Sequence, residues 1–236
     1  MSDMIMQLAG VIQRDIDTLK EVSQNVANAN TTGYKAGRAF SVQALAQPAS
    51  GVAVGLDGLH TQTSINIDGG ALQTTGRVTD LALSGDAWFA VNTPQGAALT
   101  RDGRFQVDNQ GFLVSQAGHP VLGQGGPIQV AGGVLKVSSQ GEVSVDDAPV
   151  GQLSLVRVER ASDLVSRGAG LYSADVAWQP ATQYVVHQGL LERSNAAMGA
   201  DMVKMMEVSR HVETLQRALS AYDGLLNSGI NQLGKD

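Results

Sequence analysis

Two stretches of the chain, one near each end, carry apolar residues at helical spacing. In the first stretch these residues recur every three or four positions, as they do along the seam of a coiled coil. The seam positions are Ile5, Leu8, Ile12, Ile16, Leu19, Val22 and Val26. The pattern stops where Asn, Thr and Gly accumulate at residues 25–33, because these residue types favour turns over helix. It predicts a helix that ends in this turn.

The second stretch repeats the seam over a greater length. Its apolar positions are Met198, Met202, Met205, Val208, Val212, Leu215, Leu219, Tyr222 and Leu226. Ser194 and Asn195 precede it as candidate N-caps, and Asp201 falls in the first turns, where the helix dipole favours an acidic residue. The pattern predicts a long C-terminal helix that Gly224 and Gly229 weaken near its end.

The residues between these stretches predict short strands separated by turns. The expected hairpins pair Trp88–Val91 with Ala97–Thr100, Arg104–Val107 with Phe112–Ser115, and Val134–Val137 with Glu142–Val145. Gly151–Glu159 is expected to form one longer strand. Strands at this close spacing indicate an antiparallel sandwich or distorted barrel rather than βαβ units.

The sequence thus predicts an α+β fold. In it the N- and C-terminal helices pair as a coiled-coil-like core segment, with an inserted all-β domain of short antiparallel strands. Residues 1–35 together with 190–236 form the expected helical core domain. Residues 36–76 are expected to be an extended connector, and 77–189 a β-rich outer domain.

Composition narrows the classes of function. The 236 residues carry a net charge of −6, which argues against a protein that coats nucleic-acid phosphates. The absence of Cys excludes disulfides, thiolate zinc sites and cysteine nucleophiles. No segment approaches the ~20 apolar residues of a membrane span, and the first residues lack the basic and apolar regions of a usual signal peptide. We expect no nucleic acid and no lipid insertion.

No set of residues forms a convincing catalytic or metal-binding motif. The four histidines are isolated along the chain, at positions 60, 119, 187 and 211. The carboxylate pairs Asp102/Asp108 and Asp146/Asp147 lie in turn sequences, where Asp bonds its own backbone. Aromatic residues make up only 4% of the chain, too few for a sugar-binding cleft. We expect no enzyme activity, metal or cofactor; a glycan-active periplasmic enzyme is kept as the alternative from another class.

The two seams leave two interpretations open. The terminal helices pack only on each other, or they also pack on other chains. Residues 1–40 carry equal numbers of basic and acidic side chains, so little charge repels a close neighbour. A thin helical hairpin also leaves much apolar surface bare, at about 1.5–3 kcal/mol of lost burial for each large side chain. These points favour packing on other chains; a surface adhesin with a coiled-coil stalk is a further alternative.

Four motifs in order along the chain resemble those of bacterial flagellar basal-body rod and hook proteins. They are VANANTTGYK at 26–35, LALSGDAWFAV at 81–91, TRDGRF at 100–105 continuing to residue 123, and QGLLERSN at 188–195. The first contains the family's turn motif, here Asn28, Asn30, Thr31, Thr32, Gly33 and Tyr34. SRHVE at 209–213 is most similar to proximal-rod members, whereas the distal-rod and hook-type paralogues are the alternative.

This resemblance implies a structural subunit of the flagellar rod, without catalysis or cofactor. Terminal helices of the family pair into the inner layer of a tube, and the β-rich domain lies outside. The implied partners are copies of this chain, other proximal-rod subunits, the distal-rod protein and the flagellar type III export apparatus. The implied location is the basal-body rod in the periplasmic space, a drive shaft that transmits torque from motor to hook, reached without a cleaved signal peptide.

Overall fold

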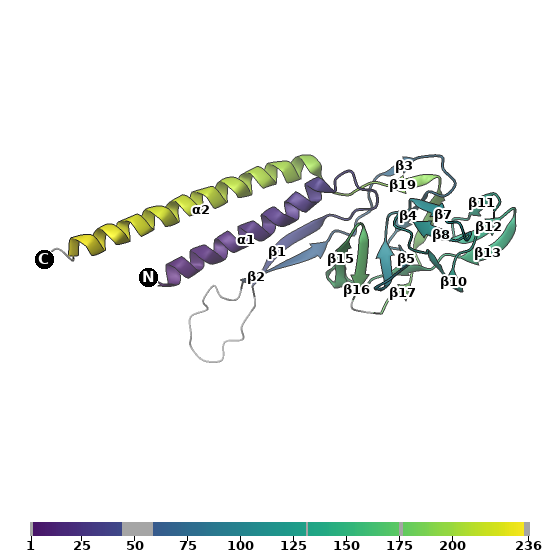
Figure 1. Cartoon of the computed structure of the whole chain (residues 1–236), viewed down its shortest axis with the longest axis horizontal. Coiled ribbons are helices and arrows are strands. Elements are labelled where there is room, and N and C mark those ends of the chain that lie inside the picture. The colour runs from purple at the N-terminus through teal and green to yellow at the C-terminus, as the bar shows by residue number, and fades with distance from the viewer. Residues whose placement is uncertain (1, 44–58, 131, 175–176, 234–236) are drawn as a thin grey trace. The chain divides into compact units, whose positions relative to one another are not determined.

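A computed structural model describes residues 2–43, 59–130, 132–174 and 177–233 (Figure 1). The chain divides into two compact units. The helical unit comprises Met1–Val26, Gly37–Thr63 and Ala197–Asp236, and the β unit comprises Ala27–Ala36 and Ser64–Ala196. The expected connector over 36–76 falls in part on residues 44–58, which lie outside the described residues.

The N-terminal helix α1 runs over Ser2–Ala27, which confirms the predicted helix and its end. The chain then turns, as the Asn- and Thr-rich sequence predicts. The amide of Thr31 donates to the carbonyl of Asn28, and the amide of Tyr34 donates to that of Thr31. Gly33 has φ +67°, a conformation that glycine adopts without a side-chain penalty.

The C-terminal helix α2 runs over Met198–Leu233, with Asp201 in its first turn as expected. The prediction that Ser194 or Asn195 caps it was wrong. The helix begins later, the Ser194 hydroxyl accepts from the amide of Ala196, and the Asn195 side chain bonds other segments of the β unit. Over the described residues, neither helix has the length and apolar character that crossing a bilayer requires.

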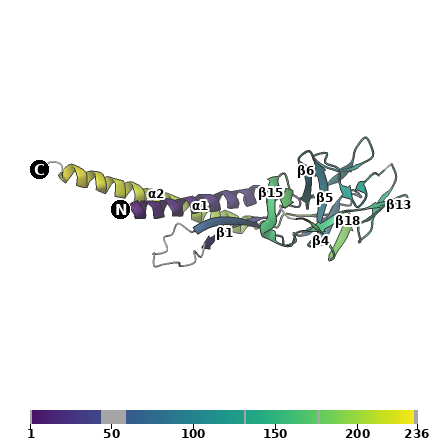
Figure 2. The same ribbon diagram turned by 90° about the horizontal axis from the view of Figure 1, so that it is seen from below.

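Within the helical unit, α1 and α2 run alongside each other in opposite directions, as both views show (Figures 1 and 2). The imidazole Nδ1 of His211 lies 2.6 Å from the carboxylate of Asp15 and links the two helices. The unit also contains the strand β1, Gly37–Gln43, and most of β2, Leu59–Ile65, and these two strands form a two-stranded sheet; the last two residues of β2 belong to the β unit. Two terminal helices with inserted antiparallel strands confirm the α+β class; coiled-coil pairing stays a prediction.

The β unit is built from short strands. In chain order they are β3 Leu72–Thr74, β4 Leu81–Gly85, β5 Trp88–Thr93, β6 Gly96–Thr100, β7 Phe105–Val107, β8 Leu113–Ser115, β9 Leu122–Gly123, β10 Gly126–Pro127, β11 Leu135–Val137, β12 Glu142–Val145, β13 Ala148–Gln152, β14 Leu155–Arg157, β15 Leu164–Gly168, β16 Leu171–Ala174, β17 Gln179–Pro180, β18 Tyr184–Gln188 and β19 Leu190–Glu192. A 3₁₀ turn, Ala161–Asp163, precedes β15.

The largest sheet has six strands in the order β15-β16-β6-β5-β14-β17, with antiparallel pairing throughout. Smaller sheets are β11-β12-β13, β18-β4, β19-β3, β7-β8 and β10-β9. The three predicted hairpins are confirmed as β5–β6, β7–β8 and β11–β12. Each of these hairpins is closed by a short polar or glycine-containing turn, which is why local sequence identifies them.

The prediction of one strand over Gly151–Glu159 was wrong. Leu153 and Ser154 separate β13 from β14, because the chain changes sheets there. The amide of Leu153 donates to the carbonyl of Gly141, and that of Ser154 donates to Leu122. β13 pairs with β12, whereas β14 pairs with β5 and β17.

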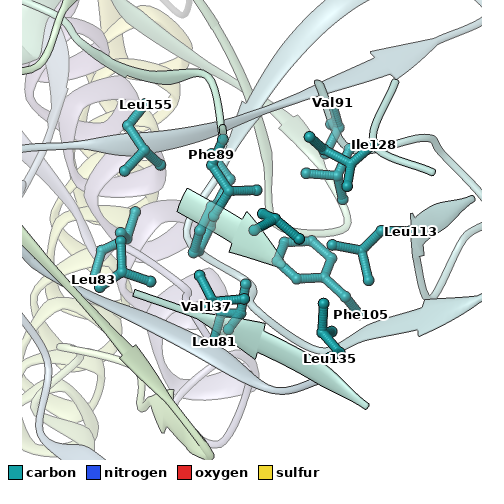
Figure 3. Close-up of a cluster of buried hydrophobic side chains, with 14 of the residues drawn as sticks. Leu81, Leu83, Phe89, Val91, Phe105, Leu113, Ile128, Leu135, Val137 and Leu155 are labelled. Carbon is teal, nitrogen blue, oxygen red and sulfur yellow. The ribbon is translucent and has the colours of Figure 1, made fainter. Parts of the chain in front are cut away.

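The core of the β unit is aliphatic with a pair of phenylalanines. Figure 3 shows side chains from β4, β5, β7 and β11 turned toward one another. The rings of Phe89 and Phe105 meet edge to face, with centroids 5.1 Å apart. Leu81 and Leu83 on β4 belong to this core and are 0% and 2% exposed.

Candidate functional site

Three of the four sequence motifs meet at a cluster of buried charges in the β unit. We call it the junction cluster; its members are Lys35, Arg101 and Glu192. Each side chain is only 1% exposed. The Nζ of Lys35 lies 2.6 Å from Oε1 of Glu192, and Nη1 of Arg101 lies 3.1 Å from Oε2. Glu192 thus joins the segment that follows α1 to the segment that precedes α2.

Burial and ion pairing shift the pKa values of the two cations in opposite directions. Loss of water lowers the pKa of Lys35 and of Arg101, and the negative charge of Glu192 partly offsets this in both. Further donors and acceptors complete the site. Lys35 Nζ donates to the carbonyl of Asp68 at 2.7 Å, and Glu192 Oε1 accepts from the amide of Gly70 at 2.8 Å. Such groups are buried at low cost only when they are paired in this way.

The guanidinium of Arg101 is held on several sides. It donates to the carbonyls of Leu83 and Gly85 and lies 5.3 Å from the centre of the Trp88 ring. Its Nε is buried and has no hydrogen-bond partner among the described residues. Arg101 therefore fixes the start of the TRDGRF segment against β4 and β5.

Tyr172 on β16 connects the junction cluster to the large sheet. Its ring meets that of Trp88 edge to face at 5.0 Å, and its hydroxyl accepts from the backbone amide of Lys35 at 2.9 Å. Burial raises the pKa of the Tyr172 hydroxyl above its usual value of about 10.

Gly33 packs directly against the backbone next to Arg101. Its amide donates to the carbonyl of Glu192 at 2.8 Å. A Cβ at this position would lie 2.3 Å from the carbonyl carbon of Arg101 and 2.3 Å from the amide nitrogen of Asp102. The turn motif thus requires glycine for its positive φ and also for space.

Asn195 binds two chain segments that lie beside the cluster, one at Ala36 and one at residues 66–68. Its Oδ1 accepts from the amide of Ala36 at 2.7 Å, and its Nδ2 donates to the carbonyls of Asn66 and Asp68 at 2.8 and 2.9 Å. The amide of Asn66 in turn donates to the carbonyl of Ala36. The chain passes between the units after Val26, after Ala36, before Ser64 and after Ala196. These bonds hold together the residues of the β unit next to the last three of these four crossings.

A comparable clamp lies within the helical unit. The side-chain amide of Asn25, near the end of α1, donates to the carbonyl of Gly37 and accepts from its amide, both at 2.9 Å. The Asn25 side chain is buried. It therefore holds the start of β1 against the last turn of α1.

The seam residues differ widely in burial within the single chain. Val22 and Val208 are buried, and Ile16, Met198 and Met202 are about 45% exposed. The partly buried seam residues are Leu8, Ile12, Leu19, Val26, Met205, Val212, Leu215, Leu219 and Tyr222. The side chains of Ile5 and Leu226 lie outside the described ones. Much of the apolar seam is thus still accessible to water in one chain.

Asp102 and Asp108 serve their own turns, as predicted, whereas Asp146 accepts from the amide of Val134 and Asp147 pairs with Lys136 across the hairpin. Asp108 accepts from the amides of Gln110 and Phe112, and Asp102 accepts from the amide and guanidinium of Arg104. Among the residues that the structure describes, no three His, Asp or Glu side chains gather as a metal site needs.

Sequence reasoning missed Lys35, Arg101, Glu192, Asn195 and Asn25 as individual residues. Four of them lie inside the quoted motifs, and Asn25 directly precedes the first. Charged residues within these motifs were an available signal, since a buried charge requires a buried partner. The partner could not be identified, because Lys35 and Glu192 are 157 positions apart.

Two family models match the chain. Residues 82–145 match the flagellar hook protein FlgE/F/G D1 domain, and residues 187–233 match the flagellar basal body rod FlgEFG protein C-terminal region. The first match covers β4 to β12, with Arg101. The second covers the end of β18, Glu192, Asn195 and α2.

Relatives align over almost the whole chain. The flagellar basal-body rod protein FlgF of Caulobacter vibrioides is 35% identical over 95% of this chain and 94% of its own length. FlgF of Mesorhizobium japonicum is 33% identical over 94% and 93%. FlgF of Escherichia coli is 33% identical over 95% of each. The similarity therefore includes the helices, the β unit and the junction segments.

Proposed function

This chain belongs to the family of flagellar basal-body rod proteins. We propose that its two units have different roles in the rod. The chain is a structural subunit of the basal-body rod, of the proximal-rod type. The end-to-end similarity to FlgF proteins carries this conclusion. In the proposal, residues 1–35 and 190–236 form the core domain of the assembled rod, 36–76 a connector, and 77–189 the outer domain.

The helical seams are the proposed contact surfaces with neighbouring rod subunits. Nine seam residues stay only partly buried in the single chain, and three more are nearly half exposed. Burying a large apolar side chain contributes about 1.5–3 kcal/mol, so completing the burial of several would supply a strong driving force for assembly. Packing at heptad spacing against helices of other copies, and of other axial rod proteins, supplies this burial.

The junction cluster is proposed to fix how the chain leaves one unit and enters the other. The amide of Gly33, after α1, donates to the backbone of Glu192, and the side chain of Asn195, before α2, accepts from the amide of Ala36. The carboxylate of Glu192 binds Arg101. A subunit that carries load through these crossings needs them firmly held. Rigid crossings suit a shaft that transmits torque from motor to hook.

Location and export follow from the same family membership. We place the chain in the rod within the periplasmic space and expect its delivery by the flagellar type III apparatus without a cleaved signal. Neither catalysis nor a cofactor is part of this function. A distal-rod or hook-type paralogue is the second candidate, favoured by the match of residues 82–145 to the hook protein FlgE/F/G model.

The test is the composition of purified basal bodies. An epitope inserted in the exposed turn at Gly118 marks the chain, since a Cβ there meets nothing within 4 Å. The tagged chain should co-purify with the rod, and cells that lack the chain should form no complete rod or hook. Complete rods in cells without the chain, or basal bodies without the tag, would contradict the proposal.

A further inference from the structure

Residues 184–195, which we call the closing segment, complete the core of the β unit although they come last in it. Its strand β18 pairs with β4 over five residues, from Tyr184 opposite Gly85 to Gln188 opposite Leu81. β4 and β18 form a two-stranded sheet of their own, so β18 is the strand partner of β4, three of whose five residues are buried. Val186 on β18 lies in the core, only 4% exposed.

Gln188 ties the closing segment to two strands at once. Its Nε2 donates to the carbonyl of Val78 at 2.7 Å and to that of Leu135 at 2.9 Å. Its Oε1 accepts from the amide of Val137 at 3.1 Å. One side chain thus satisfies backbone groups before β4 and on β11.

Glu192 and Asn195 repeat this arrangement. Each makes three side-chain bonds to segments far upstream: Glu192 to Lys35, Gly70 and Arg101, and Asn195 to Ala36, Asn66 and Asp68. Three polar side chains, at positions 188, 192 and 195, therefore bond the closing segment to upstream residues at 35–36, 66–78, 101 and 135–137.

Without the closing segment, buried groups in the upstream residues would lose their hydrogen-bond and ion-pair partners. β4 would lose its strand partner, and its buried backbone groups would lose their bonds. Lys35 and Arg101 would be two buried cations without a counterion, which is far costlier than the paired state. Docking of the closing segment therefore supplies both the strand partner of β4 and the counterion of the two buried cations.

We propose that the β unit is closed by its own last residues: the upstream strands acquire a stable core only when the closing segment docks. A chain that is presented N-terminus first accordingly keeps this unit open until residue 195 is available. The inference concerns folding of the single chain and holds whether or not the chain assembles into a rod.

Native-state amide exchange on the full-length monomer tests this directly, because it measures the free energy of opening residue by residue. If the closing segment is required for the core, amides of residues 184–192 and of β4, β5 and β6 open together. They should show one shared protection factor and one shared dependence on denaturant. Exchange of 184–192 through a smaller, separate opening, with β5 and β6 still protected, would overturn the proposal.

A variant pair extends the test. Glu192→Gln removes the counterion of both cations at nearly constant shape, and should speed exchange of both sets by the same factor, on the order of 100-fold or more. Asp147→Asn breaks the exposed ion pair with Lys136, whose side chains are 58% and 79% exposed, and should change neither set. If Glu192→Gln speeds amide exchange only in residues 184–195, the closing segment packs on a core that is already stable without it, and the proposal is refuted.

Discussion

Replacement of Gly33 probes the junction at its tightest contact. Alanine at this position must adopt φ near +67°, which costs an L-residue about 1–2 kcal/mol. Its Cβ would also lie 2.3 Å from two backbone atoms of Arg101 and Asp102, which no side-chain rotation can relieve. Overpacking of this kind costs about 1–3 kcal/mol more. We expect Gly33→Ala to destabilise the β unit by about 2–5 kcal/mol.

Gly118 supplies the matched control. It has φ +81°, so alanine there meets the same backbone strain, but a Cβ meets nothing within 4 Å. Gly118→Ala should therefore cost only about 1–2 kcal/mol. The difference between the two variants isolates the contact of Gly33 with the Arg101 backbone.

Tryptophan fluorescence during urea unfolding measures this difference. Both tryptophans of the chain, Trp88 and Trp178, lie in the β unit, so the signal reports on that unit alone. In cells, Gly33→Ala should already reduce the number of hooks, and Gly33→Val should reduce it further, because β-branching opposes a positive φ. Equal stabilities of Gly33→Ala and Gly118→Ala would refute the contact argument, and normal hook numbers in both Gly33 variants would show an ordinary linker residue.

Three further predictions concern the seam and the junction cluster. Leu215→Asp places a charge in the α2 seam and should abolish swimming while the protein is still made. Cells with Gln216→Asp, at the exposed neighbouring position, should swim, and motile Leu215→Asp cells would contradict seam packing. Glu192→Gln should destabilise the β unit in urea by about 3–5 kcal/mol, because it leaves two buried cations unpaired. Lys35→Met should cost clearly less, because the ion pair between Glu192 and Arg101 stays intact, and equal losses would refute this electrostatic account. Because the pKa of Tyr172 is raised, the folded chain retains a proton that the unfolded chain releases above pH ~10. The free energy of unfolding should therefore fall above that pH by up to about 1.4 kcal/mol per pH unit, and the fall should be shallower in Tyr172→Phe.

Local signals in the sequence were enough to predict both helices and three hairpins. The heptad spacing identified both helices, and the Asn- and Thr-rich turn ending in Gly33 marked where α1 ends. Each confirmed hairpin is specified by a turn and by the residues that flank it, so no distant contact is needed to find it.

The errors arose where distant contacts decide. Leu153 and Ser154 have strand-like neighbours on both sides, and only their bonds to Gly141 and Leu122 break the run into two strands. Asn195 is a good N-cap by residue type, but its amide is used by Ala36 and Asn66 instead. Side-chain chemistry alone could not separate these uses.

The junction cluster was out of reach for the same reason. Its three charges come from segments 91 and 157 positions apart, and a single sequence carries no record of which cation meets which anion. The seam residues, in contrast, were predicted from periodicity alone, and their incomplete burial in one chain is the observation on which the proposed packing against other rod subunits rests.

The central claim is that the seam faces of α1 and α2 are covered by neighbouring subunits in the rod. Electron cryomicroscopy of intact basal bodies that carry this chain tests it most directly. The account predicts that the face of α2 from Met205 to Tyr222 packs on helices of adjacent rod subunits. A map in which this face is turned to solvent, or in which the chain has no place in the rod, would contradict it.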